Sequence, residues 1–142
     1  MEIKILDKET GKNPIIQNQI YALFKQLSPN KRPLNFDEIL HQNNQIVLIA
    51  CFLADKVVGI ASMANYSVIS GKKGWIEDVV VSENYRGMGI GRKLIEKLLA
   101  IADEEYLTEV LLFTEDHRNA AIHLYESLNF KRKESNIFVL KR

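Results

Sequence analysis

Residues 77–94 constrain the fold more than any other part of the chain. They have the sequence Glu-Asp-Val-Val-Val-Ser-Glu-Asn-Tyr-Arg-Gly-Met-Gly-Ile-Gly-Arg-Lys-Leu. Val79 to Val81 is a β-branched apolar run, which is typical of a buried strand. Glycines follow at alternate positions, and from Ile90 to Ile101 apolar residues then recur at helical spacing. The stretch therefore predicts a strand, a glycine-rich turn and the start of a helix.

A turn of this kind forms a natural binding place for phosphate. The first N–H groups of a helix have no acceptor within the helix, and the helix dipole adds partial positive charge around them. Glycine permits positive φ there and leaves no Cβ between the backbone and a ligand. Arg86 and Arg92 flank the glycines and can add charge-assisted contacts. We therefore expect the turn to bind an anion.

The spacing of the glycines excludes two common phosphate-binding loops. The dinucleotide fingerprint is G-x-G-x-x-G, whereas this turn is G-x-G-x-G. The Walker loop ends in Gly-Lys-Ser or Gly-Lys-Thr, and Gly91-Arg92-Lys93 lacks that hydroxyl. The pattern that fits is Arg-x-x-Gly-x-Gly, at residues 86–91.

This pattern resembles the pyrophosphate loop of the GNAT acetyltransferase superfamily. The sequence Asn-Ala-Ala-Ile-His-Leu-Tyr-Glu-Ser-Leu-Asn-Phe, at residues 119–130, is similar to a second block of that family. The resemblance is firm over residues 75–130 and extends to the rest by element order. It implies one α/β domain over residues 1–142, with a mixed, mostly antiparallel twisted sheet, helices on both faces, and acetyl-coenzyme A as the cosubstrate.

The same resemblance implies a set of binding residues. The glycine-rich turn would hold the diphosphate, and the pantetheine arm would pair with the backbone of the central strand where two strands separate. A backbone N–H near Val79 or Val80 would polarise the thioester carbonyl. The implied cofactor-binding residues are Val79, Val80, Val81, Arg86, Gly87, Met88, Gly89, Ile90, Gly91, Arg92, Asn119 and Tyr125.

Tyr125 is the candidate general acid. A phenol has a reference pKa of about 10 and a thiol about 8.5, so a positioned tyrosine can protonate a departing thiolate. Periodicity alone would make Tyr125 a packing residue on its helix, and the family block favours the catalytic interpretation.

The general base is less sharply defined. Glu77 and Asp78 alternate along the strand, so a regular strand directs only one of them into the cleft, although a β-bulge would change this. We favour Glu77, acting through water on the substrate ammonium. Either acid could instead bind a cationic amine or pair with a lysine, and Glu115, Asp116 and His117 are alternatives at a strand end.

Composition limits the function classes. The 142 residues carry 19 basic and 18 acidic side chains, a net charge of +1, which gives no argument for nucleic acid as the main partner. Cys51 is the only cysteine, so an intrachain disulfide and a cysteine-rich zinc site are excluded, and the three histidines lack ligand spacing for a metal.

The apolar run 46–54 is too short for a membrane span, and residues 1–5 show no signal-peptide core. We expect a cytoplasmic protein with no membrane partner. The sequence does not decide between a monomer and a homodimer.

Patterning predicts the remaining elements. The family resemblance implies that the segment between the first two helices shapes the acceptor site. Tyr21, Arg32 and His41 are the candidate lining residues. Gly59 is expected to mark a bulge. The expected elements are strands at 2–6, 45–54, 56–66, 76–81 and 109–114, helices from 14 to about 27, 35–41, 89–105 and 118–128, polar turns at 7–13 and 70–74, and a closing strand pair at 130–133 and 137–141.

These observations predict an N-acetyltransferase that moves acetyl from acetyl-coenzyme A to a primary amine. A small metabolite, a polyamine and a protein or peptide amine all remain as acceptors. Residues 77–81 are also similar to the central strand of glucosamine 6-phosphate N-acetyltransferases, which makes that sugar phosphate one option. The competing hypotheses are a non-catalytic acyl-coenzyme A sensor or subunit, and a nucleotide-binding regulator.

Overall fold

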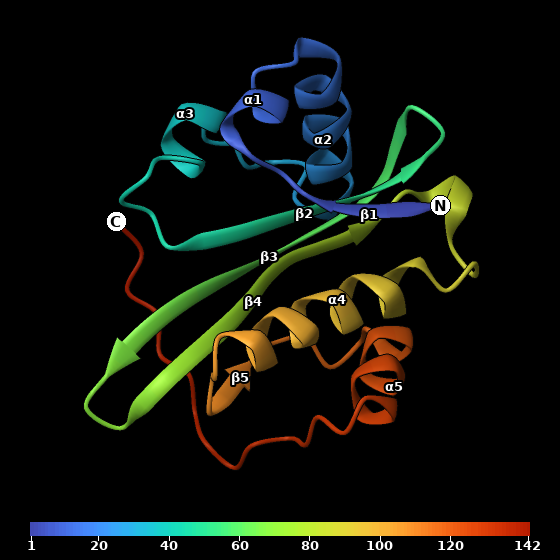
Figure 1. The fold of residues 1–142 in the computed structure, drawn as a ribbon. Coiled ribbons are helices and arrows are strands. Elements are labelled where there is room, and N and C mark those ends of the chain that lie inside the picture. The colour runs from blue at the N-terminus through green and yellow to red at the C-terminus, as the bar shows by residue number, and fades with distance from the viewer.

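A computed structural model describes all of residues 1–142. One twisted sheet lies between two sets of helices (Figure 1). None of the helices combines the length and the apolar composition that a membrane span requires. In chain order the elements are β1 (Glu2–Ile5), α1 (Lys8–Gly11), α2 (Pro14–Leu27), α3 (Phe36–Ile39), β2 (Ile46–Leu53), β3 (Lys56–Val68), β4 (Gly71–Val81), the 3-10 turn η1 (Glu83–Tyr85), α4 (Ile90–Glu104), β5 (Glu109–Leu111) and α5 (Asn119–Ser127).

The sheet has a simple topology, with the strands in the order β1-β2-β3-β4-β5. Neighbours are antiparallel from β1 to β4, and β4 and β5 are parallel. A parallel pair needs a crossover connection, and α4 supplies it. Helices α1 to α3 lie on one side of the sheet, and α4 and α5 lie on the other (Figure 1). The predicted mixed, mostly antiparallel sheet with helices on both faces is confirmed.

Strand β2 shows how the sheet joins two hydrophobic cores. Ile49 and Cys51 belong to one core, whereas Leu48, Ala50 and Phe52 belong to the other, because successive side chains of a strand point to opposite faces. A strand that is apolar on both faces is stable only between two covering layers. Helix α4 covers the first core with Ile90, Leu94, Ile95, Leu98, Ile101 and Ala102.

Helix α2 is fixed at its start and along its length. Asn13 caps it by accepting a hydrogen bond from the N–H of Ile15 at 2.9 Å, and Pro14 occupies the first turn as predicted. Its Gln19 side chain accepts from the N–H of Val57 at 2.7 Å. These contacts hold α2 against β3, where Ile20 and Leu23 enter the second core.

The predicted irregularity at Gly59 is confirmed. Cys51 pairs with Gly59 and Phe52 pairs with Val57, so one extra residue of β3 bulges out. A Cβ on Gly59 would lie 3.0 Å from Ile90 Cγ2 and 3.1 Å from Leu94 Cδ1. Glycine therefore lets the first turns of α4 pack directly on β3.

The structure corrects several predicted boundaries. The predicted turn at 7–13 contains the short helix α1, which Asp7 caps by accepting from the N–H of Thr10 at 2.7 Å. Strand β4 begins at Gly71, five residues before the predicted start, because Lys72 and Lys73 continue the ladder with β3. Strand β5 ends at Leu111 and not at Thr114.

The predicted closing strands at 130–133 and 137–141 are wrong in this structure. Residues 130–142 form no strand, and their one backbone hydrogen bond runs from the N–H of Phe130 to the carbonyl of Tyr125 at the end of α5. Their sequence has strand composition, but β-structure requires a paired edge, and these residues run past the sheet without pairing. Asn129 adopts φ 69°, which confirms its expected left-handed position after α5.

We expect Leu94→Ala to lower the free energy of unfolding by about 2–5 kcal/mol, because Leu94 is fully buried between α4 and the sheet. Urea unfolding followed by circular dichroism measures the change. Val68→Ala, at a half-exposed site in β3, is the matched control and should cost much less. Equal losses for the two variants would contradict the assignment of this core.

Candidate active site

An open edge of β4 is the basis of the site. Strand β4 pairs with β5 only at Lys73, Gly74 and Trp75, and then continues to Val81 without that partner. The N–H of Ser82 donates to the carbonyl of Val58 in β3. Because successive peptide groups of a strand face opposite edges, the peptide of Val81 faces the open side. The separation of β4 from β5 therefore leaves backbone groups available to an extended ligand.

The glycine-rich turn lies at the end of this open edge. Gly87 and Gly89 adopt φ values of 80° and 75°, which side-chain-bearing residues rarely adopt. A Cβ at either glycine would find no protein atom within 4 Å. The backbone N–H groups of residues 87–92 donate to no other protein group, and no side chain caps α4. The structure thus brings together free amides, open space and the positive end of a helix.

Gly91 is a different kind of glycine. A Cβ there would lie 3.4 Å from Leu124 Cδ2 and 3.9 Å from Val81 Cγ2. Its surroundings are apolar protein atoms, so Gly91 serves the packing of α4 against α5 and β4. The three glycines are equivalent in the sequence, but only Gly87 and Gly89 face open space.

The two arginines are held differently. Arg86 donates from Nε to the carbonyl of Val81 at 3.3 Å, which keeps it beside the open edge. Arg92 donates to Ser127 Oγ at 2.6 Å and forms an ion pair with Glu96 at 3.3 Å. Arg92 therefore joins α4 to α5, and its charge lies next to the first turn of α4. Met88 and Ile90 complete the predicted loop, with Met88 half-exposed and Ile90 buried in the core.

Tyr125 lies on α5 and packs against the first core. Its ring makes an edge-to-face contact with Phe130 at 5.9 Å between centroids. Burial raises the pKa of Tyr125 above its ordinary value, and the nearby charge of Arg118 lowers it to a smaller extent. The phenol therefore stays protonated at neutral pH and can donate a proton. Val79 and Val81 pack against the same core, whereas Asn119 is exposed at the first turn of α5.

A β-bulge reshapes β4 in front of the turn. Ile60 pairs with Val80 and Ser62 pairs with Glu77, so Ala61 alone opposes Asp78 and Val79. Asp78 adopts φ 53°, a position that glycine usually occupies in such a bulge. Aspartate is among the few residues that tolerate this conformation. A strained residue held beside an open edge is a pattern found at functional sites.

The bulge breaks the regular alternation of side chains at Glu77 and Asp78, which is the exception that the sequence analysis allowed for. Glu77 and Asp78 are exposed residues, but nearby protein atoms partly desolvate both carboxyl groups and raise their pKa values, and the charge of Asp78 raises the pKa of Glu77 further. In both groups the charge of Lys31 acts in the opposite direction. The two carboxyl groups therefore share one environment, and Glu77 is a stronger base than an ordinary glutamate.

Lys31 is the residue that sequence reasoning missed. It lies in the loop between α2 and α3, which was expected to shape the acceptor site, and its charge reaches both acids. Nothing in the spacing of residues 28–33 distinguishes Lys31 from Arg32. Tyr21 has a structural position, because its hydroxyl donates to the carbonyl of Leu34 at 3.3 Å and its ring contacts Phe36.

The other candidates lie at exposed turns. His41 accepts a hydrogen bond at Nδ1 from the N–H of Asn43. Glu115 and His117 approach each other at 3.2 Å, and Asp116 forms an ion pair with Arg132 at 3.3 Å, so these acids have partners on the surface. No group of three or more His, Cys, Asp and Glu side chains is placed to hold a metal ion.

Comparisons with known proteins agree with this geometry. The model of the acetyltransferase (GNAT) family matches residues 16–130. Glucosamine 6-phosphate N-acetyltransferase 1 of Dictyostelium discoideum is 31% identical over 136 residues, covering 92% of this chain and 83% of that protein. N-alpha-acetyltransferase 30 of Saccharomyces cerevisiae is 38% identical over 60 residues, 42% of this chain and 34% of that protein. The chain thus spans most of the first relative and about a third of the second.

Solved structures show the same fold. A putative acetyltransferase of Agrobacterium tumefaciens superposes with a TM-score of 0.84 at 20% identity, covering 99% of this chain and 100% of that one. Glucosamine-6-phosphate N-acetyltransferase of Arabidopsis thaliana gives a TM-score of 0.77 at 21% identity, with 99% of both chains covered. The protein belongs to the acetyltransferase (GNAT) family, a class that acts with acetyl-coenzyme A.

We expect Gly89→Val to weaken binding of acetyl-coenzyme A at least tenfold. Valine disfavours φ 75° and would place methyl groups in the open space beside the free amides. Isothermal titration calorimetry measures the dissociation constant, and Ala100→Val, on the exposed side of α4, adds the same side chain as a control. Unchanged affinity in the Gly89 variant would show that the turn does not hold the diphosphate.

We expect Asp78→Asn to raise the melting temperature more at pH 8 than at pH 4. The folded state raises the pKa of Asp78, so stability present below the unfolded pKa of this group is lost as pH rises through its folded pKa. Asparagine mimics the protonated form and tolerates positive φ. Thermal melts at both pH values test this, with Asp55→Asn in the β2–β3 turn as the control. A larger gain at pH 4 would contradict the sign.

Proposed function

We propose that this protein transfers the acetyl group of acetyl-coenzyme A directly to a primary amine. The observation that carries the proposal is the set of free amides at residues 87–92, which follows the unpaired edge of β4, while Tyr125 packs against the core to which Ile90 belongs. The cosubstrate has an anionic diphosphate, an extended arm and a departing sulfur. These parts require an anion site, a free strand edge and a proton donor, respectively. The family match supports the same conclusion.

The residues present fit acetyl-coenzyme A. The N–H groups around Gly87 and Gly89 would bind the diphosphate, with Arg86 beside them, and the open peptide edge near Val79 to Val81 would pair with the pantetheine arm. When bound, the cosubstrate supplies a thioester whose acyl carbon accepts the amine. An N–H group near Val79 or Val80 would then stabilise negative charge on the acyl oxygen.

Two side chains carry out the proton transfers. Glu77, with its raised pKa, takes a proton from the substrate ammonium, directly or through water, so that the nitrogen lone pair can form the new C–N bond. As the C–S bond breaks, Tyr125 would donate its phenolic proton to the departing sulfur, and the second proton that the nitrogen loses on becoming an amide would restore the phenol. Asp78 and Lys31 set the charge around Glu77, and Asp78 is placed to attract a cationic amine.

We propose glucosamine 6-phosphate as the first acceptor to test. The relative named for that substrate is matched along 83% of its length, whereas the N-alpha and thialysine enzymes are matched over 34% and 38% of theirs. Lys31, whose charge reaches the acidic pair, and its neighbour Arg32 carry positive charge that a phosphate beside an amine would need. A peptide α-amine and a lysine-like ε-amine are the competing acceptors.

An acceptor panel tests the proposal. Coenzyme A release is measured with acetyl-coenzyme A and glucosamine 6-phosphate, glucosamine, thialysine or a peptide with a free N-terminus. We expect release with at least one amine, and faster release with the phosphorylated sugar than with glucosamine. Tight binding of acetyl-coenzyme A without release for any amine would favour a non-catalytic sensor. Preference for ATP or NAD over coenzyme A would favour a nucleotide-binding regulator.

We also propose that the protein is cytoplasmic. Its one thiol, Cys51, is buried in β2, and burial raises the pKa of this group, so it is a poor nucleophile. Nothing in the fold depends on oxidising conditions. Fractionation of cells that express the tagged full-length protein tests the proposal, which recovery in a membrane or secreted fraction would contradict.

We expect Tyr125→Phe to slow acetyl transfer about 100-fold while leaving the affinity for acetyl-coenzyme A unchanged, because the ring packing remains and only the proton donor is lost. Single-turnover kinetics and calorimetry separate the two effects. Phe130→Leu changes the neighbouring ring without touching the phenol and is the control for packing. A Tyr125→Phe enzyme with wild-type turnover would remove Tyr125 from the mechanism.

A further inference from the structure

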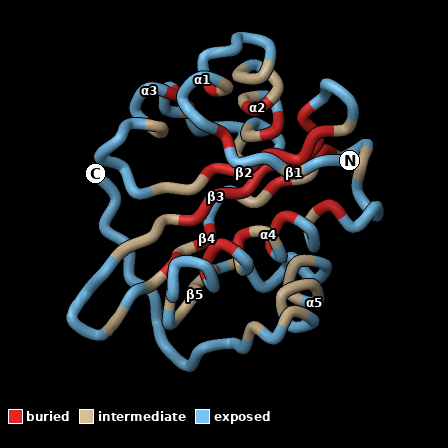
Figure 2. Tube along the Cα trace, viewed as in Figure 1, coloured by how far each residue is buried: buried red, intermediate tan, exposed pale blue.

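The connection between β4 and α4 has no cap of its own. It runs over the surface, and most of its residues are exposed (Figure 2). It begins with η1, where Ser82 holds the N-cap position but makes no capping hydrogen bond with its side chain. The first N–H groups of a helical turn have no acceptor within that turn. A group from elsewhere in the chain is therefore needed to satisfy them.

Gln26 of α2 supplies this group. Its Oε1 accepts a hydrogen bond from the N–H of Glu83, the first residue of η1, at 3.2 Å. The preceding N–H, that of Ser82, donates to the carbonyl of Val58 in β3 at 2.9 Å. One bond from a helix and one from the sheet thus fix the start of η1.

The anchoring becomes sparse after η1. Lys56 Nζ lies 5.2 Å from the ring centre of Tyr85, the last residue of η1. Arg86 then donates from Nε to the carbonyl of Val81 at 3.3 Å. Beyond it, the backbone N–H groups of residues 87–92 donate to no other protein group. The position of η1 therefore determines where the proposed diphosphate amides lie.

Helix α2 also carries the loop that reaches the two acids of β4. The hydroxyl of Tyr21, on α2, donates to the carbonyl of Leu34 at 3.3 Å, which ties the far end of this loop back to the helix. The loop contains Lys31, whose charge acts on both acids. One helix is thus joined to the acceptor side through this loop and to the cosubstrate side through Gln26.

A second glutamine of α2 makes a comparable bond at a different place. Gln19 lies seven residues before Gln26, on the same face of the helix. Its Oε1 accepts from the N–H of Val57 at 2.7 Å, in a partly buried bond that holds α2 to β3, whereas the bond of Gln26 is exposed. A buried donor that loses its partner costs more stability than an exposed donor, which water can satisfy. The two glutamines therefore allow stability and positioning to be tested separately.

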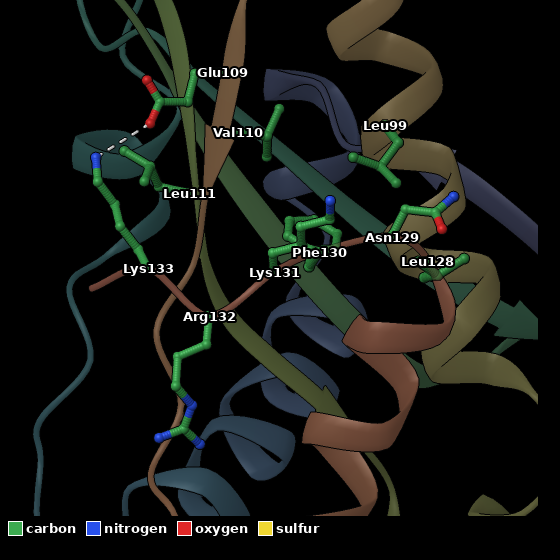
Figure 3. A pocket seen from close by; sticks show the side chains of 10 residues that line it. All are labelled: Leu99, Glu109, Val110, Leu111, Leu128, Asn129, Phe130, Lys131, Arg132 and Lys133. Atoms are coloured by element: carbon green, nitrogen blue, oxygen red, sulfur yellow. Dashed lines mark ion pairs between the residues drawn. The ribbon is translucent and has the colours of Figure 1, made fainter. Parts of the chain in front are cut away.

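A pocket of about 480 Å³ beside β5 shares no residue with this link. Its lining comes from α4, β5 and residues 128–133 (Figure 3). The basic side chains among them, Lys131, Arg132 and Lys133, attract anions. Because neither α2 nor η1 lines the pocket, a substitution at Gln26 leaves its lining unchanged. A change in coenzyme A affinity in such a variant would report on the turn and not on this pocket.

We propose that Gln26 is a positioning residue for the cosubstrate: it fixes η1 to α2, so that the helix carrying the acceptor loop also sets the position of the diphosphate amides. This inference rests on the proposed function, in which residues 87–92 bind acetyl-coenzyme A. A turn already held in its bound conformation binds more tightly, because it loses less conformational freedom on binding. Since Gln26 acts through η1, its loss changes the affinity for the cosubstrate and leaves the chemical step unchanged.

A pair of matched substitutions tests the proposal. Gln26→Met keeps the length and helix propensity of the side chain but removes the acceptor. We expect it to raise the dissociation constant of coenzyme A about threefold to tenfold, the effect of one lost hydrogen bond, while the melting temperature changes little. Gln19→Met should do the reverse, lowering the melting temperature without changing the dissociation constant. Calorimetric titration and thermal melts of the full chain measure both quantities.

A rescue variant and amide exchange complete the experiment. Gln26→Glu keeps an acceptor oxygen and should restore the affinity for coenzyme A, and exchange of the Glu83 amide should be faster in Gln26→Met than in the wild type. Unchanged affinity in Gln26→Met, an equal loss in Gln19→Met, or no rescue by Gln26→Glu would overturn the proposal. If Gly89→Val weakens binding and Gln26→Met does not, this inference fails while the proposed function stands. A wild-type chain that does not bind coenzyme A contradicts both.

Discussion

The separation of β4 from β5 is the constraint on which the rest of the site depends. The two strands share three residue pairs and then part, while β4 continues to Val81. A buried strand edge normally satisfies its peptide groups by pairing. The edge of β4 beyond Trp75 instead leaves its peptide groups without a strand partner, and the strand is followed by the free amides at the start of α4. The parallel crossover brings both features together, because α4 begins where β4 ends and must return across the sheet to β5.

The bulge at Asp78 is the second feature of β4 on which the site depends. A regular strand would place Glu77 and Asp78 on opposite faces. With the extra residue in β4, both acids feel the charge of Lys31, while Val79 and Val81 pack against the first core and Val80 lies in the second. The left-handed backbone of Asp78 costs energy, and the antiparallel ladder with β3 on either side of the bulge holds it in place.

The sequence predicted the elements that have a strong local signal. The valine run, the glycine spacing and the periodicity from Ile90 onward specified β4, the turn and α4. It could not predict that Gly91 packs against Leu124 while Gly89 faces open space, because that difference arises from the position of α5. Lys31 was missed because its loop carries no periodicity, and its approach to the two acids arises only in the folded chain. Residues 137–141 were predicted as a strand from composition, but strand formation depends on a pairing partner, which composition does not specify.

The most direct test of this account is amide chemical-shift mapping of the ¹⁵N-labelled protein during titration with coenzyme A. The account predicts that the largest changes fall on the backbone amides of residues 87–92, followed by those at the open edge of β4, and that amides of β1 and β2 change little. Saturable binding that leaves residues 87–92 unperturbed would contradict it.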